Sequence, residues 1–503
     1  MVLKNKKGLR LTIRILGLVS ISLIGILIIF KFWSLFILYS KLKPLCPECN
    51  IILVVVDTLS SNHLPCYGYF RDTAPHFCAF GRNNIFFKNN YSNATWTLPS
   101  HVSLFTSLYP STHGVVSYQK NALKASVPFL PEMLQKRGYK TLFFIPPDDE
   151  ALPINTVYSR GINEFVSYSN SWSEPLERFR RSVLDHQKTF LFLHTYFVHA
   201  PYLIENSPLL YANESGIINQ LPLTERQYSV VSSNLVDYLI KQIPLDIERG
   251  YIDKNNLIVS DLYQFLLENK QGQNKILEYV AEFRDKYPYL FGPYLYNANW
   301  LSKIDVSNQK HLDFIRALYD QKIYQLDQNL IKTLINFVGQ QEFDANTVVI
   351  ITSDHGEEFG EHGTIEHSTL FDTNIKTPLI ISVPKISPKS IDYLTQSVDL
   401  VPTILDIVGI KYNSVFQGQS LVRYLLGSPE VDRFIVTDGF MLKSRAIRRG
   451  VWKLLLTSRG VDLVPNELFN ITMDPNETKS VLFDNLRVAS RLLKEYLSSR
   501  VGL

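Results

Sequence analysis

Ile51-Ile52-Leu53-Val54-Val55-Val56-Asp57-Thr58 is the stretch of sequence that decides the fold. Its six apolar residues are rich in β-branched side chains and show no polar alternation, which is typical of a buried parallel strand. A second such run, 347–352, is followed by Ser353, Asp354 and His355. Open α/β sheets place their chemistry at the carboxyl ends of such strands. The two runs therefore predict one site shared by two strands.

Other patterns along the chain alternate between strands and helices. Strands are expected at 141–145, 190–193 and 378–383, and an amphipathic helix is expected over 311–338. We therefore predict an α/β fold, with a mostly parallel sheet sandwiched by helices.

This pattern also predicts the domain organisation. The main domain is expected over 50–430, and helical patterns without comparable strands predict a helical insertion at about 205–300. A small C-terminal α+β module is expected over 431–503.

The charge of the chain is unevenly distributed. The 503 residues carry a formal net charge of +4, but eight basic residues precede the first acidic residue, Glu48. The remainder holds 43 basic and 47 acidic residues. Because a nucleic-acid-binding surface needs an excess of basic residues, we expect no nucleic acid partner.

Residues 15–39 form an apolar segment whose only charge is Lys31. A helix of this length, at about 1.5 Å per residue, crosses the roughly 30 Å of hydrocarbon in a bilayer. The alternative is a cleaved signal peptide. The apolar part of a signal peptide is usually about 7–15 residues long, however, and the segment in this chain is longer and is followed by no small-residue cleavage site. We expect a transmembrane signal anchor in the lipid bilayer, with residues 1–14 as a basic cytoplasmic tail. The chain is then a single-pass membrane protein with its main domain periplasmic or extracellular.

The four cysteines lie near the start of the main domain, at Cys46, Cys49, Cys66 and Cys78. Outside the cytoplasm they could form disulfides. The Cys46-x-x-Cys49 spacing also fits half of a metal knuckle or a redox pair, but no second half is present. A structural role is therefore the favoured interpretation.

Thr97 stands at the expected start of a helix, before Leu98-Pro99-Ser100-His101. Backbone N–H groups and the partial positive charge of a helix N-terminus favour an anionic ester at this place. The alternative is that Thr97 or Ser100 is only an N-cap.

A metal site is predicted from Asp57, Thr97, Asp354 and His355. Carboxylate, hydroxyl and imidazole donors suit one divalent ion, with Zn²⁺ favoured and Mn²⁺ or Ca²⁺ as further options. Such an ion would activate the threonine hydroxyl, which is otherwise a weak nucleophile.

From Asn50 to about Thr478 the chain resembles the sulfatase family of the alkaline phosphatase superfamily. The resemblance implies that family's fold and rests on motifs in a fixed order. They are Asn50–Leu59, Cys66–Tyr69, Trp96–Thr106, Tyr109–Gly114, His199–Tyr202, Thr352–Gly363, Thr377–Pro378, Val398–Thr403 and Glu467–Glu477.

The resembling nucleophile motif departs from the family pattern. Sulfatases carry Cys/Ser-x-Pro-x-Arg and oxidise its first residue to formylglycine, whereas this chain has Thr97 there and His101 in place of the arginine. Threonine cannot give that aldehyde. The segment instead resembles the branch of phosphodiesterases and phosphoethanolamine transferases, which implies a phosphothreonine-type intermediate on Thr97.

The resemblance also assigns roles to histidines. His199 and His367 fall where the family places residues that bind the substrate or protonate its leaving group. His194 and His362 are expected to be structural or to support other ligands. Thr195 stands where two-metal members carry aspartate, which implies a single metal ion. The pair Glu357-Glu358 is either a solvated helix face or a support for His355.

The function expected from the resemblance is a metal-dependent hydrolase or transferase acting on anionic esters. The substrate is expected to be a phosphate ester, or a sulfate ester, of an envelope or extracellular glycan or lipid. Two alternatives remain open: a sulfuric ester hydrolase that works without formylglycine, and a membrane-tethered binding protein without turnover.

Overall fold

The computed structural model describes most of the chain from residue 44 onward. The described residues are 44–117, 123–146, 160–168, 171–202, 210–211, 233–249, 257–268, 279, 282, 302–413, 416–459 and 462–499. Residues 46–503 form one compact unit, and residues 1–45 form another. The expected cytoplasmic tail and signal anchor lie outside the described residues. Among the described residues, no helix is long and apolar enough to cross a membrane.

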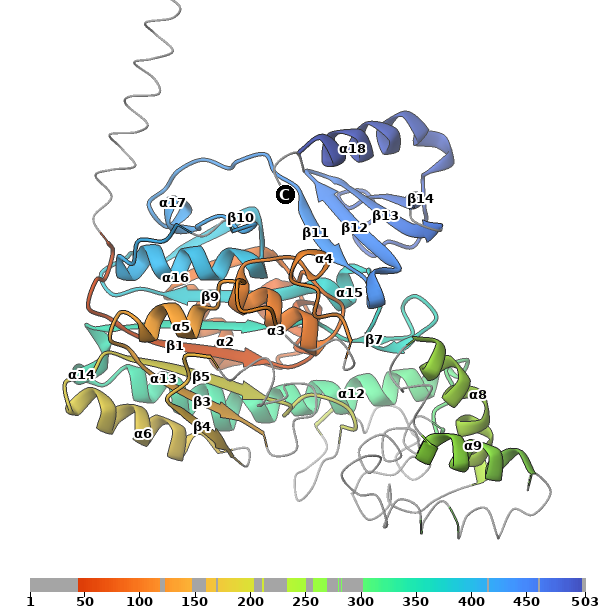
Figure 1. Ribbon diagram of the computed structural model, residues 1–503, viewed down its shortest axis with the longest axis horizontal. Coiled ribbons are helices and arrows are strands. Elements are labelled where there is room, and N and C mark those ends of the chain that lie inside the picture. The colour runs from red at the N-terminus through yellow and green to blue at the C-terminus, as the bar shows by residue number, and fades with distance from the viewer. Residues whose placement is uncertain are drawn as a thin grey trace, which may run out of the picture. The chain divides into compact units, whose positions relative to one another are not determined.

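An eight-stranded sheet forms the centre of the larger unit (Figure 1). Its order is β10 (Lys389–Gln396), β2 (Ile85–Tyr91), β9 (Lys376–Ser382), β6 (Thr347–Ser353), β1 (Asn50–Val56), β5 (Thr189–Thr195), β3 (Lys140–Ile145) and β4 (Glu164–Ser167). Every residue of β1 is buried, as the unbroken apolar run predicts. The predicted mostly parallel sheet is confirmed. Only β9 runs against both of its neighbours, β2 and β6.

Helices cover both faces of this sheet. On one face Ile52, Val54 and Val56 share a core with α2 (Pro75–Arg82), α6 (Ser173–Leu184), α12 (Gln309–Leu326) and α13 (Lys332–Val338). On the other face lies α3 (Thr97–Thr106), whose Phe105 ring lies 4.9 Å from the ring of Phe192 on β5. Figure 1 shows α5 (Leu130–Gln135) and α16 (Leu400–Val408) on the same side as α3. The β strands therefore alternate their side chains between two separate helical layers.

The expected helix over 311–338 is interrupted by a π-helical turn at Asp327–Ile331, between α12 and α13. This turn directs Asp327 at the start of α2, where its carboxylate accepts hydrogen bonds from the backbone N–H groups of His76 and Phe77. A carboxylate at a helix N-terminus satisfies donors that have no partner within the helix. The π-helical turn between α12 and α13 is therefore hydrogen-bonded to the N-terminus of α2.

A second, antiparallel sheet lies in the C-terminal part of the chain. It contains β11 (Ile435–Asp438), β12 (Ser444–Arg449), β13 (Trp452–Arg459) and β14 (Asp462–Asn470), and it shares a core with α18 (Leu486–Ser499). The expected small C-terminal α+β module therefore contains an antiparallel sheet and a helix that packs against it. Within the interval of the expected insertion, the structure describes the helices α8 (Ser233–Arg249) and α9 (Leu257–Glu268).

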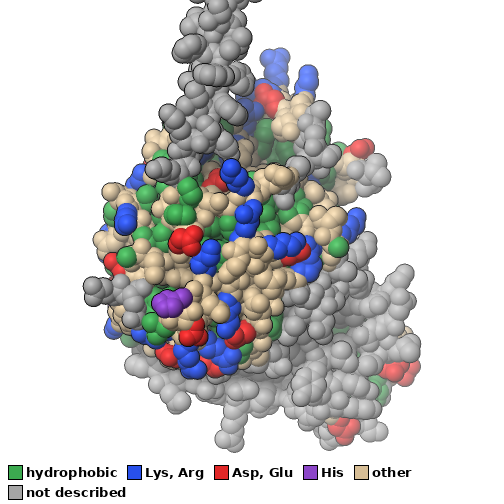
Figure 2. Space-filling view, turned by 60° about the vertical axis from the view of Figure 1, so that its left-hand side comes forward, with side chains coloured by type: hydrophobic (Ala, Val, Ile, Leu, Met, Phe, Trp, Pro, Cys, Tyr) green, Lys and Arg blue, Asp and Glu red, His purple; other side chains and the backbone are tan. Residues whose placement is uncertain are grey.

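The cysteines form two disulfides, Cys46–Cys49 and Cys66–Cys78. The second one closes the segment that follows β1. Figure 2 shows basic and acidic side chains intermingled on the face turned to the viewer.

Candidate active site

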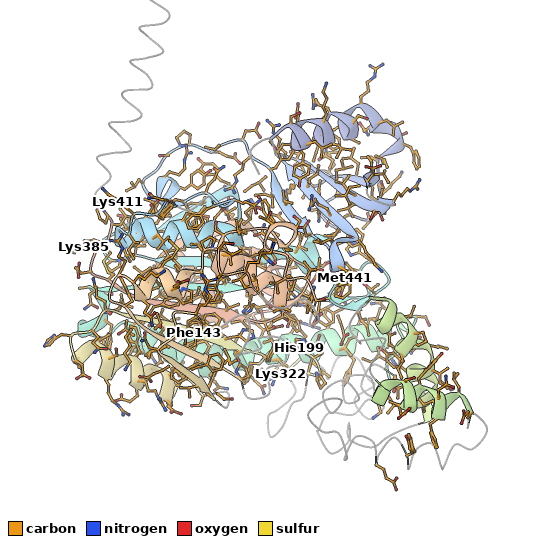
Figure 3. The ribbon with its side chains drawn as sticks, in the orientation of Figure 1. Phe143, His199, Lys322, Lys385, Lys411 and Met441 are labelled. Atoms are coloured by element: carbon orange, nitrogen blue, oxygen red, sulfur yellow. A yellow bond between two sulfur atoms is a disulfide. The ribbon has the colours of Figure 1, made fainter. Side chains whose placement is uncertain are left out.

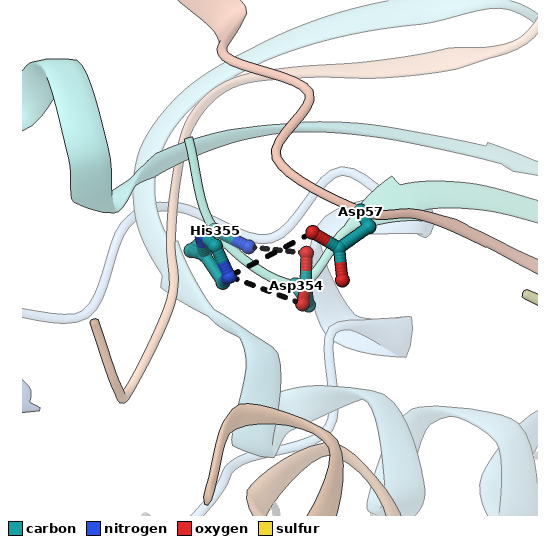
Figure 4. A group of neighbouring side chains, drawn as sticks. All are labelled: Asp57, Asp354 and His355. Carbon is teal, nitrogen blue, oxygen red and sulfur yellow. Dashed lines mark hydrogen bonds and ion pairs between the residues drawn. The ribbon is translucent and has the colours of Figure 1, made fainter. Parts of the chain in front are cut away.

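The carboxyl ends of β1 and β6 bring three predicted metal ligands together. The parallel register pairs Val56 with Ser353, so Asp57 and Asp354 follow at the same edge of the sheet. One ligand atom each from Asp57, Asp354 and His355 lies within 4.8 Å of the others, and all three residues are fully buried (Figure 4). The structure thus gathers in one place residues that are about 300 positions apart.

Backbone donors fix the orientation of these ligands. Asp354 Oδ1 accepts hydrogen bonds from the N–H groups of Thr58, at 3.2 Å, and His355, at 2.8 Å. His355 Nδ1 lies 2.9 Å from the carbonyl oxygen of Gly356, which leaves Nε2 facing Asp354 Oδ2 at 3.4 Å. An imidazole that donates from Nδ1 has its lone pair on Nε2. The Nε2 lone pair of His355 therefore faces the two carboxylates, as binding of a shared cation would require.

The residues present fit a divalent cation. Asp354 Oδ2 is buried and has no hydrogen-bond partner among the described residues. Burial raises the pKa of Asp354 to about 7, against the hydrogen bond from His355. Burial and the proximity of His367 hold the pKa of His355 well below its ordinary value, so this imidazole is neutral. Two buried carboxylates beside a neutral imidazole offer what a divalent metal requires.

Thr97 is the first residue of α3 and lies beside these ligands. Its Oγ1 donates a hydrogen bond to Asp57 Oδ2, at 3.2 Å, and lies 3.4 Å from His355 Nε2. The N-cap residue is Trp96, which makes no side-chain capping bond. Ser100 Oγ donates instead to the backbone oxygen of Asp354, at 2.7 Å. Neither hydroxyl therefore serves as the N-cap, which was the alternative interpretation of this segment.

His199 and His367 lie near each other and near the metal ligands. His199 follows the carboxyl end of β5 (Figure 3), and its ring centre is 5.5 Å from that of His367. The ring of His367 is in turn 4.6 Å from the ring of His355. Two residues in the left-handed region flank His367, namely Glu366 at φ 70° and Ser368 at φ 113°. Such strained positions in non-glycine residues concentrate at functional sites.

Glu357 supports His367 and does not support His355. It is only 1% exposed, which contradicts the solvated-face interpretation. Its Oε1 lies 3.3 Å from His367 Nδ1, and its Oε2 accepts a hydrogen bond from the hydroxyl of Tyr202 at 3.0 Å. The residue after it, Glu358, binds His362, Thr364 and Thr373.

The two histidines differ in their affinity for a proton. Burial, together with His367, lowers the pKa of His199. Burial also acts to lower the pKa of His367, but the hydrogen bond to Glu357 and the carboxylates of Glu357 and Glu366 outweigh it, and that pKa is raised. The site therefore offers one neutral and one readily protonated imidazole.

Comparison with known proteins identifies the family. The sequence model of the Sulfatase family matches residues 49–410, and that of the C-terminal part of N-sulphoglucosamine sulphohydrolase matches residues 360–500. The chain belongs to the sulfatase family. It is a sulfatase-family ester hydrolase, and this family uses a divalent metal, typically Ca²⁺.

Relatives of this sulfatase-family chain are distant. It is 22% identical to arylsulfatase K of Xenopus laevis over 489 residues, covering 88% of this chain and 80% of the relative. It is 21% identical to N-acetylglucosamine-6-O-sulfatase of Bacteroides thetaiotaomicron, and the match covers 74% of this chain and 70% of the relative.

Solved structures share the fold at low identity. The phosphonate monoester hydrolase of Agrobacterium radiobacter superposes with a TM-score of 0.61 at 17% identity, covering 90% of this chain and 95% of that one. A 2-O GAG sulfatase superposes with a TM-score of 0.59 at 16% identity, and the match covers 90% of this chain and 93% of that one.

Two further histidines of this sulfatase-family chain lie behind the metal ligands. His101 Nε2 is 3.6 Å from Asp354 Oδ2, and His194 Nε2 is 3.7 Å from Asp57 Oδ2. Burial lowers the pKa of His194 to about 3 and holds the pKa of His101 well below its ordinary value. His101 stands where the family's motif carries arginine, and its spacing of four residues from Thr97 puts both residues on one helical face.

His362 lies apart from this group. Its Nδ1 is 2.6 Å from Glu358 Oε1 and its Nε2 is 3.1 Å from the backbone oxygen of Asn476. Both ring nitrogens are thus occupied by structural contacts, as expected from the sequence.

Proposed function

We propose that this chain is a metal-dependent hydrolase of anionic esters that uses Thr97 as its nucleophile. The observation that supports this most strongly is the position of Thr97 Oγ1, at the start of α3 and 3.2 Å from Asp57 Oδ2. The hydroxyl donates its hydrogen to the carboxylate, which leaves lone pairs on Oγ1 for attack on the substrate. The start of the helix favours the negative charge of the ester.

Asp57, Asp354 and His355, together with Thr97 Oγ1, are the residues proposed to hold the metal. One bound divalent ion would supply positive charge that favours ionisation of the threonine hydroxyl and neutralises the ester anion. The imidazole donor favours Zn²⁺ or Mn²⁺ over Ca²⁺, since calcium prefers oxygen ligands.

The histidines are proposed to act on the leaving group. His367 is the more basic of the two imidazoles and acts in its protonated form. It donates this proton to the ester oxygen as the bond from that oxygen to phosphorus or sulfur breaks. His199, being neutral, offers a hydrogen bond to the anion without adding charge. Water then hydrolyses the ester formed on Thr97: a water proton passes to His367, which has given up its own, and the bond from Oγ1 to phosphorus or sulfur breaks. Oγ1 regains the proton that it lost on attack, and the inorganic anion is released, or a monoester where the substrate is a diester.

A phosphate ester is the favoured substrate. Formylglycine releases sulfate with the help of a second hydroxyl on its own carbon, and a threonine lacks that group. An ester on Thr97 must instead be broken at phosphorus or sulfur. The family resemblance of the Thr97 motif favours phosphorus, whereas the similarity to arylsulfatase K and N-acetylglucosamine-6-O-sulfatase supports a sulfate ester, such as a sulfated glycan, as the second candidate. Transfer to an alcohol instead of water is the corresponding transferase reaction.

The test is turnover by the full chain of bis-p-nitrophenyl phosphate, p-nitrophenyl phosphate and p-nitrophenyl sulfate, each with Zn²⁺, Mn²⁺ or Ca²⁺. Thr97→Ala is compared with Thr112→Ala, which removes an exposed threonine hydroxyl on α4 (Pro110–His113). We expect metal-dependent cleavage that only Thr97→Ala abolishes. Turnover that survives in Thr97→Ala would exclude this nucleophile, and the preferred ester decides between phosphate and sulfate.

We further propose that residues 15–39 anchor the chain in a bilayer and that the ester belongs to an envelope or extracellular glycan or lipid. The two disulfides support a location outside the cytoplasm. The full chain should then resist extraction from membranes by alkaline carbonate. Leu23→Arg combined with Leu27→Arg should release it, because each arginine costs about 2.5–3.5 kcal/mol at the centre of a membrane helix. Extraction of the unchanged chain would contradict the anchor.

A further inference from the structure

Asn374, in the short helix α15 (Asp372–Ile375), contacts three segments of the candidate active site. We propose that it is a positioning residue, which fixes the segment of Thr97 relative to the segment of His367. This proposal rests on the proposed function. Neither the sequence patterns nor the family resemblance singles out this residue.

The side-chain amide of Asn374 joins two backbone carbonyls. Its Nδ2 donates to the oxygen of Thr369 at 2.8 Å and to the oxygen of Thr95 at 3.3 Å. Thr95 lies two residues before Thr97, and Thr369 lies two residues after His367. One amide group therefore holds the proposed nucleophile segment and the proposed acid segment at a fixed separation.

The backbone of Asn374 reaches the third segment. Its carbonyl oxygen accepts a hydrogen bond from the N–H of Gly356, at 2.6 Å, directly after the metal ligand His355. This approach requires a glycine, because a Cβ at position 356 would lie 2.3 Å from the carbonyl oxygen of Thr373. Asn374 is thus linked to the segments of the metal ligand, the nucleophile and the acid.

The helical turn that carries Asn374 is itself held in place. Asp372 forms ion pairs with two residues of the C-terminal sheet, Lys453 at 2.7 Å and Arg448 at 3.1 Å. Lys453 is fully buried, so this contact is protected from solvent. The C-terminal module therefore fixes α15, and α15 fixes the segments of the site.

The position of Asn374 makes these contacts costly to lose. The residue has no exposed surface, and the carbonyls of Thr95 and Thr369 lose a donor when the amide is removed. The two segments also include the strained Ser368, which adopts its conformation only where neighbours enforce it. A displacement of about 1 Å between reacting groups can cost roughly 10²-fold in rate.

The test compares Asn374→Asp and Asn374→Ala with Thr373→Val. Asn374→Asp places carboxylate oxygens against two carbonyl oxygens, and Asn374→Ala removes the amide without adding charge. Thr373→Val is the control, because it removes a hydrogen bond from the same helical turn to Glu358 Oε1, at 2.6 Å, without touching Thr95 or Thr369. Each variant is measured for kcat and KM with the best ester, and for hydrogen exchange of peptides covering 92–100 and 365–371.

We expect both Asn374 variants to lose about 100-fold in kcat with KM changed less than about threefold, since positioning acts on the transition state. In both Asn374 variants, hydrogen exchange should become faster in both peptides. Thr373→Val should retain the kcat and the slow hydrogen exchange of the unchanged protein. Unchanged exchange in both peptides, or an equal loss of kcat in Thr373→Val, would overturn the proposal. If the unchanged protein cleaves no ester, the proposed function fails, but the exchange measurement still decides the role of Asn374.

Discussion

Glu357 Oε1 lies 3.3 Å from Nδ1 of His367, and no solvent reaches the carboxylate. This contact directs Nε2 of His367 away from the carboxylate, where a substrate oxygen would receive its proton. It also opposes the effect of burial on the imidazole, so the pKa of His367 lies above its ordinary value. The pair thus sets both the orientation and the charge of the proposed acid.

Glu357→Gln should move the alkaline limb of the pH–rate profile to lower pH. His367 acts in its protonated form, so activity falls as pH rises through its pKa. Removing the carboxylate takes away the hydrogen bond and the negative charge that raise the pKa of His367, and burial, which lowers that pKa, then dominates. The profile of kcat/KM against pH checks this.

The control for that profile is Tyr202→Phe. It removes the other hydrogen bond to Glu357, at 3.0 Å, but keeps the charge of the carboxylate. We expect a much smaller shift of the alkaline limb. Equal shifts in the two variants would show that hydrogen bonding within the group, and not the charge of Glu357, controls His367.

Asp354→Asn should abolish tight binding of a divalent ion. The substitution keeps the size of the side chain but removes one of two buried negative charges at the site. Residues that only support a metal ligand already contribute about 10- to 100-fold to affinity, so loss of the ligand itself should cost more. Titration calorimetry with Zn²⁺ and Mn²⁺ measures the change. Asp392→Asn serves as the control, because its carboxylate is exposed on β10.

The strands and the grouping of Asp57, Asp354 and His355 could be predicted because their signals are local. An unbroken apolar run followed by polar residues identifies β1 with Asp57 and β6 with Asp354 and His355. The direction of a strand carries no such signal. The sequence could not show that β9 runs antiparallel to its neighbours, since a buried apolar run looks the same in either direction.

The rest of the site depends on contacts between loops. Nothing near Glu357 in sequence indicates that its partner is His367 and not His355, because the intervening residues fold into the hairpin of β7 (Glu358–Phe359) and β8 (Ile365–Glu366). Asp327 was likewise hidden inside a helical pattern, and its capping of α2 requires a π-turn that side-chain periodicity does not report.

Lys453→Met should destabilise the protein. The Lys453 ammonium lies between the carboxylates of Asp372, at 2.7 Å, and Glu477, at 2.6 Å, with no exposure to solvent. Removing one partner of a buried ion pair costs about 3–5 kcal/mol, because the remaining charge has no compensation. Urea denaturation measures the free energy of unfolding.

Lys136→Met is the matched control for Lys453→Met. It breaks an ion pair with Glu132 that is largely open to solvent, and exposed pairs contribute about 0–1 kcal/mol. Similar losses in the two variants would mean that the buried cluster does not hold α15 more firmly than a surface pair would.

Removal of the Cys66–Cys78 disulfide should cost more stability than removal of Cys46–Cys49. The first bridge spans 12 positions and the second spans three, and both close loops in the same part of the chain. In the chain-entropy account a loop of about 15 residues contributes roughly 3 kcal/mol, and the shorter loop contributes about 1 kcal/mol less. The double alanine variants of each pair are compared by urea denaturation under non-reducing conditions. Cys66 also lies in the segment that leads away from Asp57. If the two stability losses differ by more than this entropy difference, the Cys66–Cys78 bridge also fixes that segment in the folded state. Equal losses of stability would contradict the entropic argument.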